Sequence, residues 1–160
     1  SYLGKELLRT ETTIAFAESC TGGLASSLVT DVPGSSEYLL GSAVTYSNMA
    51  KHKLINVSEE SLEAYGAVSW QVACEMAQGV RELFGTTYGV GITGIAGPGG
   101  ATEDKPVGLV YMAVADADGV KWAKHVFGGT RTDNKMRIAL TAISMVIDRI
   151  KEKETENKDK

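Results

Sequence analysis

Apolar segments of two kinds alternate along this chain, and that alternation constrains its fold more than any other feature. Short runs with β-branched residues indicate buried strands, whereas longer runs with apolar residues three and four positions apart indicate helices. The pattern favours a layered α/β domain over a helical bundle or a β-sandwich. Strands are expected in residues 13–17, in 38–46 and from 88, and helices in 3–9, 24–30, 58–65, 69–84 and from 132 or 133 to about 150.

Two further apolar segments, residues 109–116 and 120–127, flank Asp118 and Gly119, which are typical of a tight hairpin turn. A hairpin makes its two strands antiparallel, whereas strands separated by helices are usually parallel. We therefore expect a mixed parallel and antiparallel sheet with helices on both faces.

The composition is that of one domain with a charged end. A chain of 160 residues, 43% of them hydrophobic, can bury one substantial core, so residues 1–150 are expected to form a single domain. Residues 151–160 carry mixed charge and no apolar side chain, which is typical of a fraying helix end and a solvated tail.

Charge and hydropathy limit the partners. No apolar run approaches the roughly 18 residues of a membrane span, and residues 1–10 lack the layout of a secretory signal. A soluble cytoplasmic protein is therefore expected, with Cys20 and Cys74 as reduced thiols. The net charge of −4 argues against nucleic acid and membrane partners and favours a small molecule. The expected assembly is a homo-oligomer.

Polar, glycine-rich segments follow three of the expected strands, where ligands of open α/β sheets tend to bind. The first segment, residues 18–23, reads ESCTGG and leads into a helix. Unpaired backbone N–H groups at such a helix start can hold an oxyanion or a phosphate. Alternatively, Ser19 and Thr21 only cap the helix.

The second segment, residues 45–51, ends in Lys51. A partly neutral lysine can activate a serine, and burial can lower its pKa far enough for that role. The alternative is an exposed lysine on a short helix, which is the commoner situation.

The third segment, residues 93–100, reads TGIAGPGG and fits neither the dinucleotide-binding fingerprint nor the P-loop pattern. An ordinary mobile loop is the competing interpretation. Arg131 and Arg137 flank the start of the last helix, where a guanidinium could bind phosphate or simply be solvated. His52 and His125 are the only histidines, and no HExxH motif or clustered set of ligands indicates a metal.

Four motifs together resemble the CinA C-terminal domain family. They are AESCTGG in residues 17–23, VTYSNxxK in 44–51, GAVS in 66–69 and TGIAGPGG with KPVG in 93–108. The resemblance extends from Thr13 to about Ile150. It implies a three-layer α/β/α sandwich, no metal or cofactor, and deamidation of nicotinamide mononucleotide. Many relatives carry a molybdopterin-binding-like domain ahead of this one, for which a chain of this length has no room.

The resemblance also implies the site residues. Ser19 corresponds to the nucleophile, Lys51 to its base, and Tyr46 to a residue that orients or relays the proton. Arg137 corresponds to the family's arginine early in the last helix, and Arg131 to the arginine before it. The role of Arg131 is less defined because Thr130 stands where the family often has an acidic residue. The expected substrate-binding residues are Glu18, Thr21, Gly22, Gly23, Thr93, Gly94, Arg131 and Arg137.

The resulting hypothesis is a serine-lysine amidohydrolase. Neutral Lys51 would take the proton of Ser19, whose oxygen would attack the carboxamide, and backbone amides near residues 21–23 or near Gly94 would hold the oxyanion. Burial and a nearby Arg137 would both lower the pKa of Lys51. Cys20 is the competing nucleophile, because a helix start can lower a thiol pKa. The alternative function is a module that binds or senses a nucleotide without turning it over.

Overall fold

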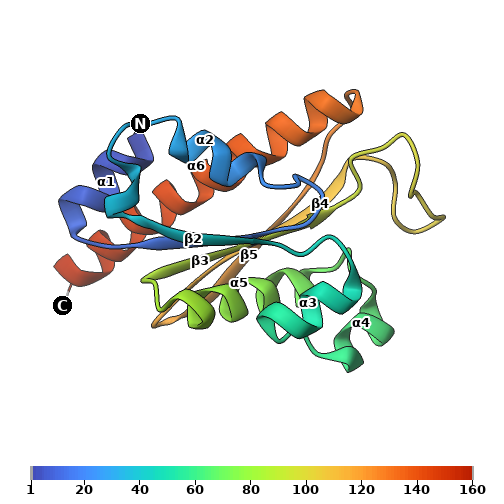
Figure 1. Ribbon diagram of the computed structural model, residues 1–160, viewed down its shortest axis with the longest axis horizontal. Helices are drawn as coiled ribbons and strands as arrows, with labels where there is room; N and C mark the ends of the chain where they lie inside the picture. Colours follow the sequence, from blue (N-terminus) through green and yellow to red (C-terminus); the bar gives the residue numbers. More distant parts are fainter. Residues whose placement is uncertain (1, 160) are drawn as a thin grey trace.

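The computed structural model describes residues 2–159 and shows one five-stranded sheet covered by helices on both faces (Figure 1). The strands are β1 (Ile14–Glu18), β2 (Leu39–Val44), β3 (Tyr88–Gly94), β4 (Leu109–Asp116) and β5 (Gly119–Val126). The helices are α1 (Tyr2–Thr10), α2 (Leu24–Thr30), α3 (Asn48–Ile55), α4 (Glu59–Tyr65), α5 (Trp70–Phe84) and α6 (Arg131–Lys158), with a 3-10 turn at Ser35–Glu37.

The sheet is mixed, as the sequence predicts. Its strand order is β2-β1-β3-β4-β5, in which β2, β1 and β3 are parallel and the β4–β5 hairpin is antiparallel. The predicted hairpin turn is one residue out of place, because Gly119 pairs with Asp116 as the first residue of β5. The turn therefore consists of Ala117 and Asp118.

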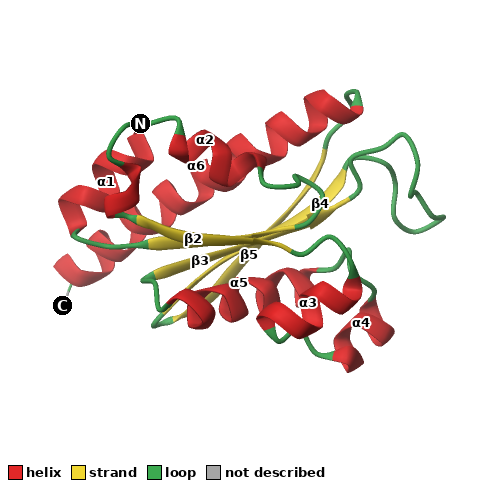
Figure 2. Ribbon diagram, in the orientation of Figure 1, coloured by secondary structure: helices red, strands yellow, loops and turns green. Residues whose placement is uncertain are grey.

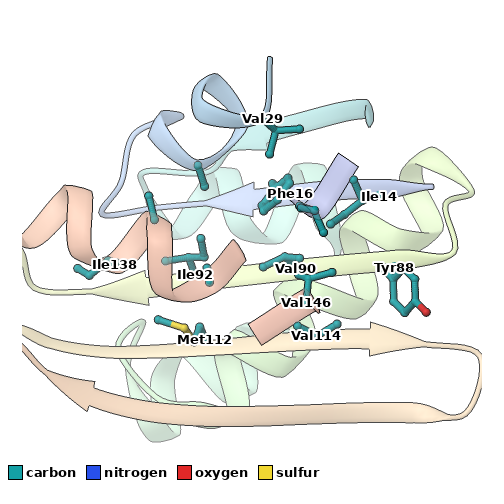
Figure 3. Close-up of a cluster of buried hydrophobic side chains, with 14 of the residues drawn as sticks. Ile14, Phe16, Val29, Tyr88, Val90, Ile92, Met112, Val114, Ile138 and Val146 are labelled. Atoms are coloured by element: carbon teal, nitrogen blue, oxygen red, sulfur yellow. The ribbon is translucent and has the colours of Figure 1, made fainter. Parts of the chain in front are cut away.

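Helices α1, α2 and α6 cover one face of the sheet, and α3, α4 and α5 cover the other (Figure 2). The larger core lies under α2 and α6, where Phe16, Val90, Ile92 and Met112 are buried (Figure 3). These bulky side chains come from β1, β3 and β4 and point toward the two helices. The expected three-layer α/β/α sandwich is confirmed.

The α5 face is packed with small residues instead. Gly89 and Gly91 of β3 lie directly beneath α5, where an added Cβ at Gly91 would come within 2.3 Å of the carbonyl oxygen of Ala73. Ala73 and Ala77 of the helix are completely buried. Alternating glycines in β3 therefore allow α5 to lie closer to the sheet than side chains would permit.

The ends of α4 and α5 are where capping residues predict them. Ser58 and Ser69 accept hydrogen bonds from the backbone N–H groups of Ser61 and Val72, so each serine caps a helix start. Gly85 ends α5 with a φ of 65°, in the left-handed region that glycine tolerates. Local sequence is sufficient to fix these boundaries.

The last helix is longer than predicted at both ends. It begins at Arg131 behind the capping residue Thr130 and continues to Lys158, so most of the expected tail at 151–160 is helical. Ion pairs hold this end, since Lys153 contacts Asp118 and Glu154 contacts Arg9. Ser1 and Lys160 lie outside the described residues. No helix within residues 2–159 has the length and hydropathy needed to cross a membrane.

Candidate active site

The parallel strands bring the three polar segments to one edge of the sheet. In the strand register Glu18 lies between Val44 of β2 and Ile92 of β3, so the residues that follow these strands are neighbours. The segment after β1 turns into α2 on one face, and the segment after β2 turns into α3 on the other (Figure 1). The site therefore forms where the chain leaves the sheet in opposite directions.

The structure places Ser19 and Lys51 in contact. The Lys51 ammonium Nζ lies 3.1 Å from Ser19 Oγ and also donates to the carbonyl oxygen of Thr45 at 2.8 Å. Helix α3 positions the lysine, because Ser47 caps the helix through the N–H of Ala50 and places Lys51 one turn later. A serine hydroxyl and a lysine amine are thus within direct hydrogen-bonding distance.

Lys51 is a buried amine without an acidic partner. Its exposed fraction is 1%, so the alternative of a solvated lysine on a short helix is wrong. Within residues 2–159, no ion pair joins it to a carboxylate. Burial lowers the pKa of Lys51 below its usual value, which favours the neutral amine that a base requires.

Cys20 is a poor competitor for the role of nucleophile. The side chain borders the same cavity as Ser19, yet it is buried and belongs to the core beneath α2 and α6. Burial raises the pKa of the Cys20 thiol to about 12, which is opposite to the lowering that a helix start could produce. The thiolate is therefore scarce at neutral pH.

The other residues of the first segment build the turn and do not border the cavity. Thr21 donates to the carboxylate of Glu18, and the N–H of Gly22 donates to the carbonyl of Ser19. Gly22 and Gly23 both have positive φ values, of 61° and 105°. Glu18, Thr21, Gly22 and Gly23 are absent from the cavity lining, so their expected part in substrate binding stays a prediction.

A cavity of about 380 Å³ opens beside the Ser19 hydroxyl. The expected residues that line it are Ser19, Tyr46, Lys51, Thr93, Gly94 and Arg131. The other lining residues, which were not among the expected site residues, are Cys20, Asn48, Ala67, Val68, Ile95, Ala96, Gly99 and Gly100, and all of them except Ala67 and Val68 lie in the three polar segments. Asn48 could have been found, since it precedes Lys51 by three positions and so lies one helical turn away on the same side.

Tyr46 and Arg131 meet at the mouth of the cavity. Arg131 donates to the Tyr46 hydroxyl at 3.0 Å and to the carbonyl of Gly97 at 2.8 Å. Tyr46 is 62% exposed, and its hydroxyl contacts neither Ser19 nor Lys51. A relay of the serine proton through Tyr46 therefore has no direct contact to support it, although Tyr46 does line the cavity.

Thr93 and Gly94 form the floor of the cavity at the end of β3. Thr93 is buried, and its hydroxyl donates to the carbonyl of Ala67 at 2.8 Å, which ties β3 to the segment before α5. A Cβ at Gly94 would come within 2.7 Å of the Leu109 carbonyl, so this glycine permits close pairing with β4. Both residues thus shape the cavity wall.

Arg137 lies outside the cavity. Its side chain is exposed on α6, whereas Arg131, the first residue of the helix, borders the cavity. Six helical positions separate the two arginines, which turns their side chains about 120° apart around the helix axis. Of the two expected arginines, Arg131 is therefore the one that lines the cavity. Arg137 also cannot be the neighbour that lowers the pKa of Lys51, a role that burial fills.

Metal binding has no donor set here. In the part of the chain that the structure describes, no three His, Cys, Asp or Glu side chains gather in a group that could hold an ion. Among the residues lining the cavity the charged side chains are Lys51 and Arg131, both cationic. The reactive and charged groups that line the cavity include the Ser19 hydroxyl, the Lys51 amine and the exposed Arg131 guanidinium.

Comparison with known proteins identifies the family. The family model of the CinA C-terminal domain matches residues 1–150. A CinA-like protein of Desulforapulum autotrophicum is 48% identical over 149 residues, and one of Syntrophomonas wolfei is 50% identical over 140. These matches cover 92% and 88% of this chain but only 35% and 34% of the relatives, so the chain spans about a third of their length.

Solved structures agree with this assignment. The competence/damage inducible protein CihA from Agrobacterium tumefaciens is 37% identical with a TM-score of 0.87, covering 92% of this chain and 93% of that one. A competence-damaged protein (CinA) superfamily protein from Escherichia coli is 31% identical with a TM-score of 0.89, covering 92% and 86%. The chain belongs to the CinA C-terminal domain family.

Proposed function

We propose that this domain is an amidohydrolase that converts nicotinamide mononucleotide into nicotinate mononucleotide and ammonia. Ser19 is the nucleophile and Lys51 is its base. The observation that carries the proposal is the contact between a buried amine without a counter-charge and a serine hydroxyl that borders a cavity. Burial without a counter-charge favours the neutral form of the amine, and the neutral amine can accept the proton of the neighbouring hydroxyl.

The Thr45 carbonyl orients the base. A carbonyl oxygen can only accept, so one N–H of Lys51 stays bonded to it at 2.8 Å in either protonation state. In the neutral amine the lone pair is then free to take the Ser19 proton across the 3.1 Å contact. Deprotonated Ser19 Oγ attacks the carboxamide carbon and forms a tetrahedral intermediate.

Collapse of the intermediate breaks the carbon–nitrogen bond. The proton held by Lys51 passes to the departing nitrogen, ammonia leaves, and a nicotinoyl ester of Ser19 remains. Water then gives its proton to Lys51, attacks the ester and releases nicotinate mononucleotide. Lys51 returns a proton to Ser19 Oγ, so the cycle closes without any added reactant except water.

The oxyanion is assigned to the loop after β3. Three amides near the start of α2 are occupied, since Gly22 donates to Ser19 and both Ala25 and Ser26 donate to Glu18. Ala96, Gly99 and Gly100 line the cavity and carry backbone N–H groups, whereas the N–H of Ile95 donates to the Leu109 carbonyl. Fixed amides of this kind stabilise the charge that develops on the carbonyl oxygen.

A phosphate suits the remaining charge of the cavity. The protein carries a net charge of −4, yet no carboxylate is among the residues that line this cavity, and Arg131 adds a cation to it. Arg131 is exposed at the mouth, where a guanidinium can bind a phosphate while the amide lies deeper, near Ser19. Nicotinamide mononucleotide has both groups, which is why it is proposed over a neutral amide.

Ammonia release tests the proposal directly. Purified protein incubated with nicotinamide mononucleotide should release ammonia and nicotinate mononucleotide in equal amounts, whereas the Lys51→Arg variant should be nearly inactive because a guanidinium stays charged. Binding of the nucleotide without ammonia release would instead support the alternative, a nucleotide-sensing module.

A further inference from the structure

Helix α2 starts without the usual cap. Its N-cap residue, Gly23, has a φ of 105° and no side chain to accept a hydrogen bond from the first turn. The first amides of a helix have no partner within the helix and need an acceptor from elsewhere. Another part of the chain must therefore supply the acceptor that a serine or aspartate normally gives.

Glu18 supplies it from the end of β1. One oxygen of its carboxylate accepts from the N–H of Ala25, and the other accepts from the N–H of Ser26, each at 2.9 Å. The hydroxyls of Thr21 and Ser26 add one further hydrogen bond to each oxygen, both at 2.6 Å. The carboxylate is completely buried, so water does not compete for these four contacts.

These contacts enclose the candidate nucleophile. The Glu18 side chain joins the end of β1 to Ala25 in the first turn of α2. Residues 19–23 form the short loop between these two points. Within the loop, the Ser19 N–H donates to the Ile92 carbonyl and the Ser19 carbonyl accepts from Gly22. These two hydrogen bonds fix the backbone of Ser19. In that position the Ser19 hydroxyl lies 3.1 Å from Lys51 Nζ.

We propose that Glu18 is a positioning residue that caps α2 and so holds Ser19 Oγ against the Lys51 amine. The proposal rests on Ser19 being the nucleophile of the proposed function. It also means that the positive end of α2 is already neutralised by a carboxylate of this chain, and so is not a binding site for a substrate anion.

The reactivity of Ser19 toward a small fluorophosphonate tests this role without any natural substrate. The Glu18→Gln variant replaces one acceptor oxygen by an NH₂ group that faces a backbone donor, so the turn must shift. We expect its labelling rate to fall about 10- to 100-fold, as a misplacement on the order of 1 Å produces. Glu18→Asp keeps two acceptor oxygens on a shorter side chain and should recover part of the rate.

Two readouts separate positioning from a general structural effect. Labelling is measured below the melting temperature of every variant, with Glu60→Gln on the exposed face of α4 as the matched control. The pH midpoint of labelling, which Lys51 sets, should not move in Glu18→Gln. A shifted midpoint would mean that the carboxylate acts on Lys51 through its charge, which would overturn the positioning role.

The remaining outcomes distinguish the two proposals. If wild-type Ser19 is labelled and Glu18→Gln is labelled equally fast, the positioning role is overturned while the nucleophile stands. If wild-type Ser19 is not labelled at all, the proposed function fails, and the role of Glu18 fails with it.

Discussion

Two basic side chains are buried within residues 2–159, at opposite ends of the sheet, and their surroundings differ in one respect. Lys51 lies where β1 and β2 end and is 1% exposed, and Arg149 lies at the hairpin end of the sheet and is 7% exposed. Lys51 contacts a hydroxyl and a carbonyl. Arg149 contacts the carboxylates of Asp116, Glu152 and Glu156.

The different partners have opposite effects on the proton. Burial lowers the pKa of Lys51, the neighbouring Cys20 offsets this effect only in part, and no carboxylate in residues 2–159 forms an ion pair with Lys51. Burial alone would also lower the pKa of Arg149, but the hydrogen bond from its Nε to Asp116 and the nearby carboxylates raise it overall. Arg149 therefore remains charged and joins the hairpin to α6, whereas Lys51 is able to lose its proton.

The contrast explains why burial of a charged residue is not by itself a sign of function. A cation buried with acids stabilises the fold as long as every member is present. A cation buried without acids reduces stability and persists where its perturbed pKa serves a reaction. The following experiments test this distinction.

The largest effect on activity is expected from substitution of Ser19, whose hydroxyl contacts Lys51. Ser19→Ala should lower the rate of ammonia release by several orders of magnitude, because the covalent intermediate cannot form. Cys20→Ser should keep most of the activity, since the Cys20 thiol is held protonated by burial. Steady-state kinetics of the two variants decide the matter, and an active Ser19→Ala enzyme that thiol reagents inactivate would assign the chemistry to Cys20.

Stability should respond in opposite directions at the two ends. Arg149→Met leaves the Asp116 carboxylate buried without its main partner and should lower the free energy of unfolding by about 3 kcal/mol. Lys51→Met removes an unpaired buried amine and should raise it by about 1 kcal/mol while abolishing activity. Urea unfolding measures both, with Lys53→Met on the exposed side of α3 as the control.

The pH dependence of stability separates the same two sites. Burial would raise the pKa of Asp116, but the hydrogen bond from Arg149 leaves it lowered overall, so its stabilising effect is lost as the pH falls through the folded-state value. Arg149→Met should therefore flatten the acid side of the stability profile. If Arg149→Met and Lys51→Met destabilise the protein equally, the proposed difference between the two ends is wrong.

A smaller effect is expected at the exposed cation of the site. Arg131→Ala should lower kcat/KM for nicotinamide mononucleotide by about two orders of magnitude, on the order of 3 kcal/mol, and should barely change the slow reaction of nicotinamide riboside. Arg137→Ala, outside the cavity on the same helix, serves as the matched control and should change either rate by less than about threefold. Equal losses with both substrates would show that Arg131 supports the fold and does not bind the phosphate.

The sequence predicted the fold well because local signals determine most of it. The strand-helix alternation placed every strand, and Ser58, Ser69 and Gly85 fixed helix ends through caps that are readable in one dimension. It allowed a short helix around Lys51 but gave no bounds for α3, and it predicted α6 too short. Ion pairs between α6 and distant residues, such as Lys153 with Asp118, stabilise that end and have no periodic signature.

The sequence predicted which residues lie near the site better than it predicted which of their side chains line the cavity. Ser19, Lys51 and Arg131 do line one cavity, but Glu18 binds the first turn of α2, and Arg137 does not line the cavity. Both errors have the same origin. Sequence places a residue near a strand end, whereas its direction depends on helix phase and on which backbone groups still need partners.

The protonation of Lys51 in the folded protein tests the central claim most directly. Its pKa can be measured by NMR titration of ¹³Cε-labelled lysine, with the Lys51 signal assigned through the Lys51→Met variant. Because the folded-state pKa is lowered, we expect Lys51 to titrate well below the roughly 10.4 of a free lysine, and ammonia release to rise with pH over that same range. A Lys51 signal that titrates together with the exposed lysines would contradict the account.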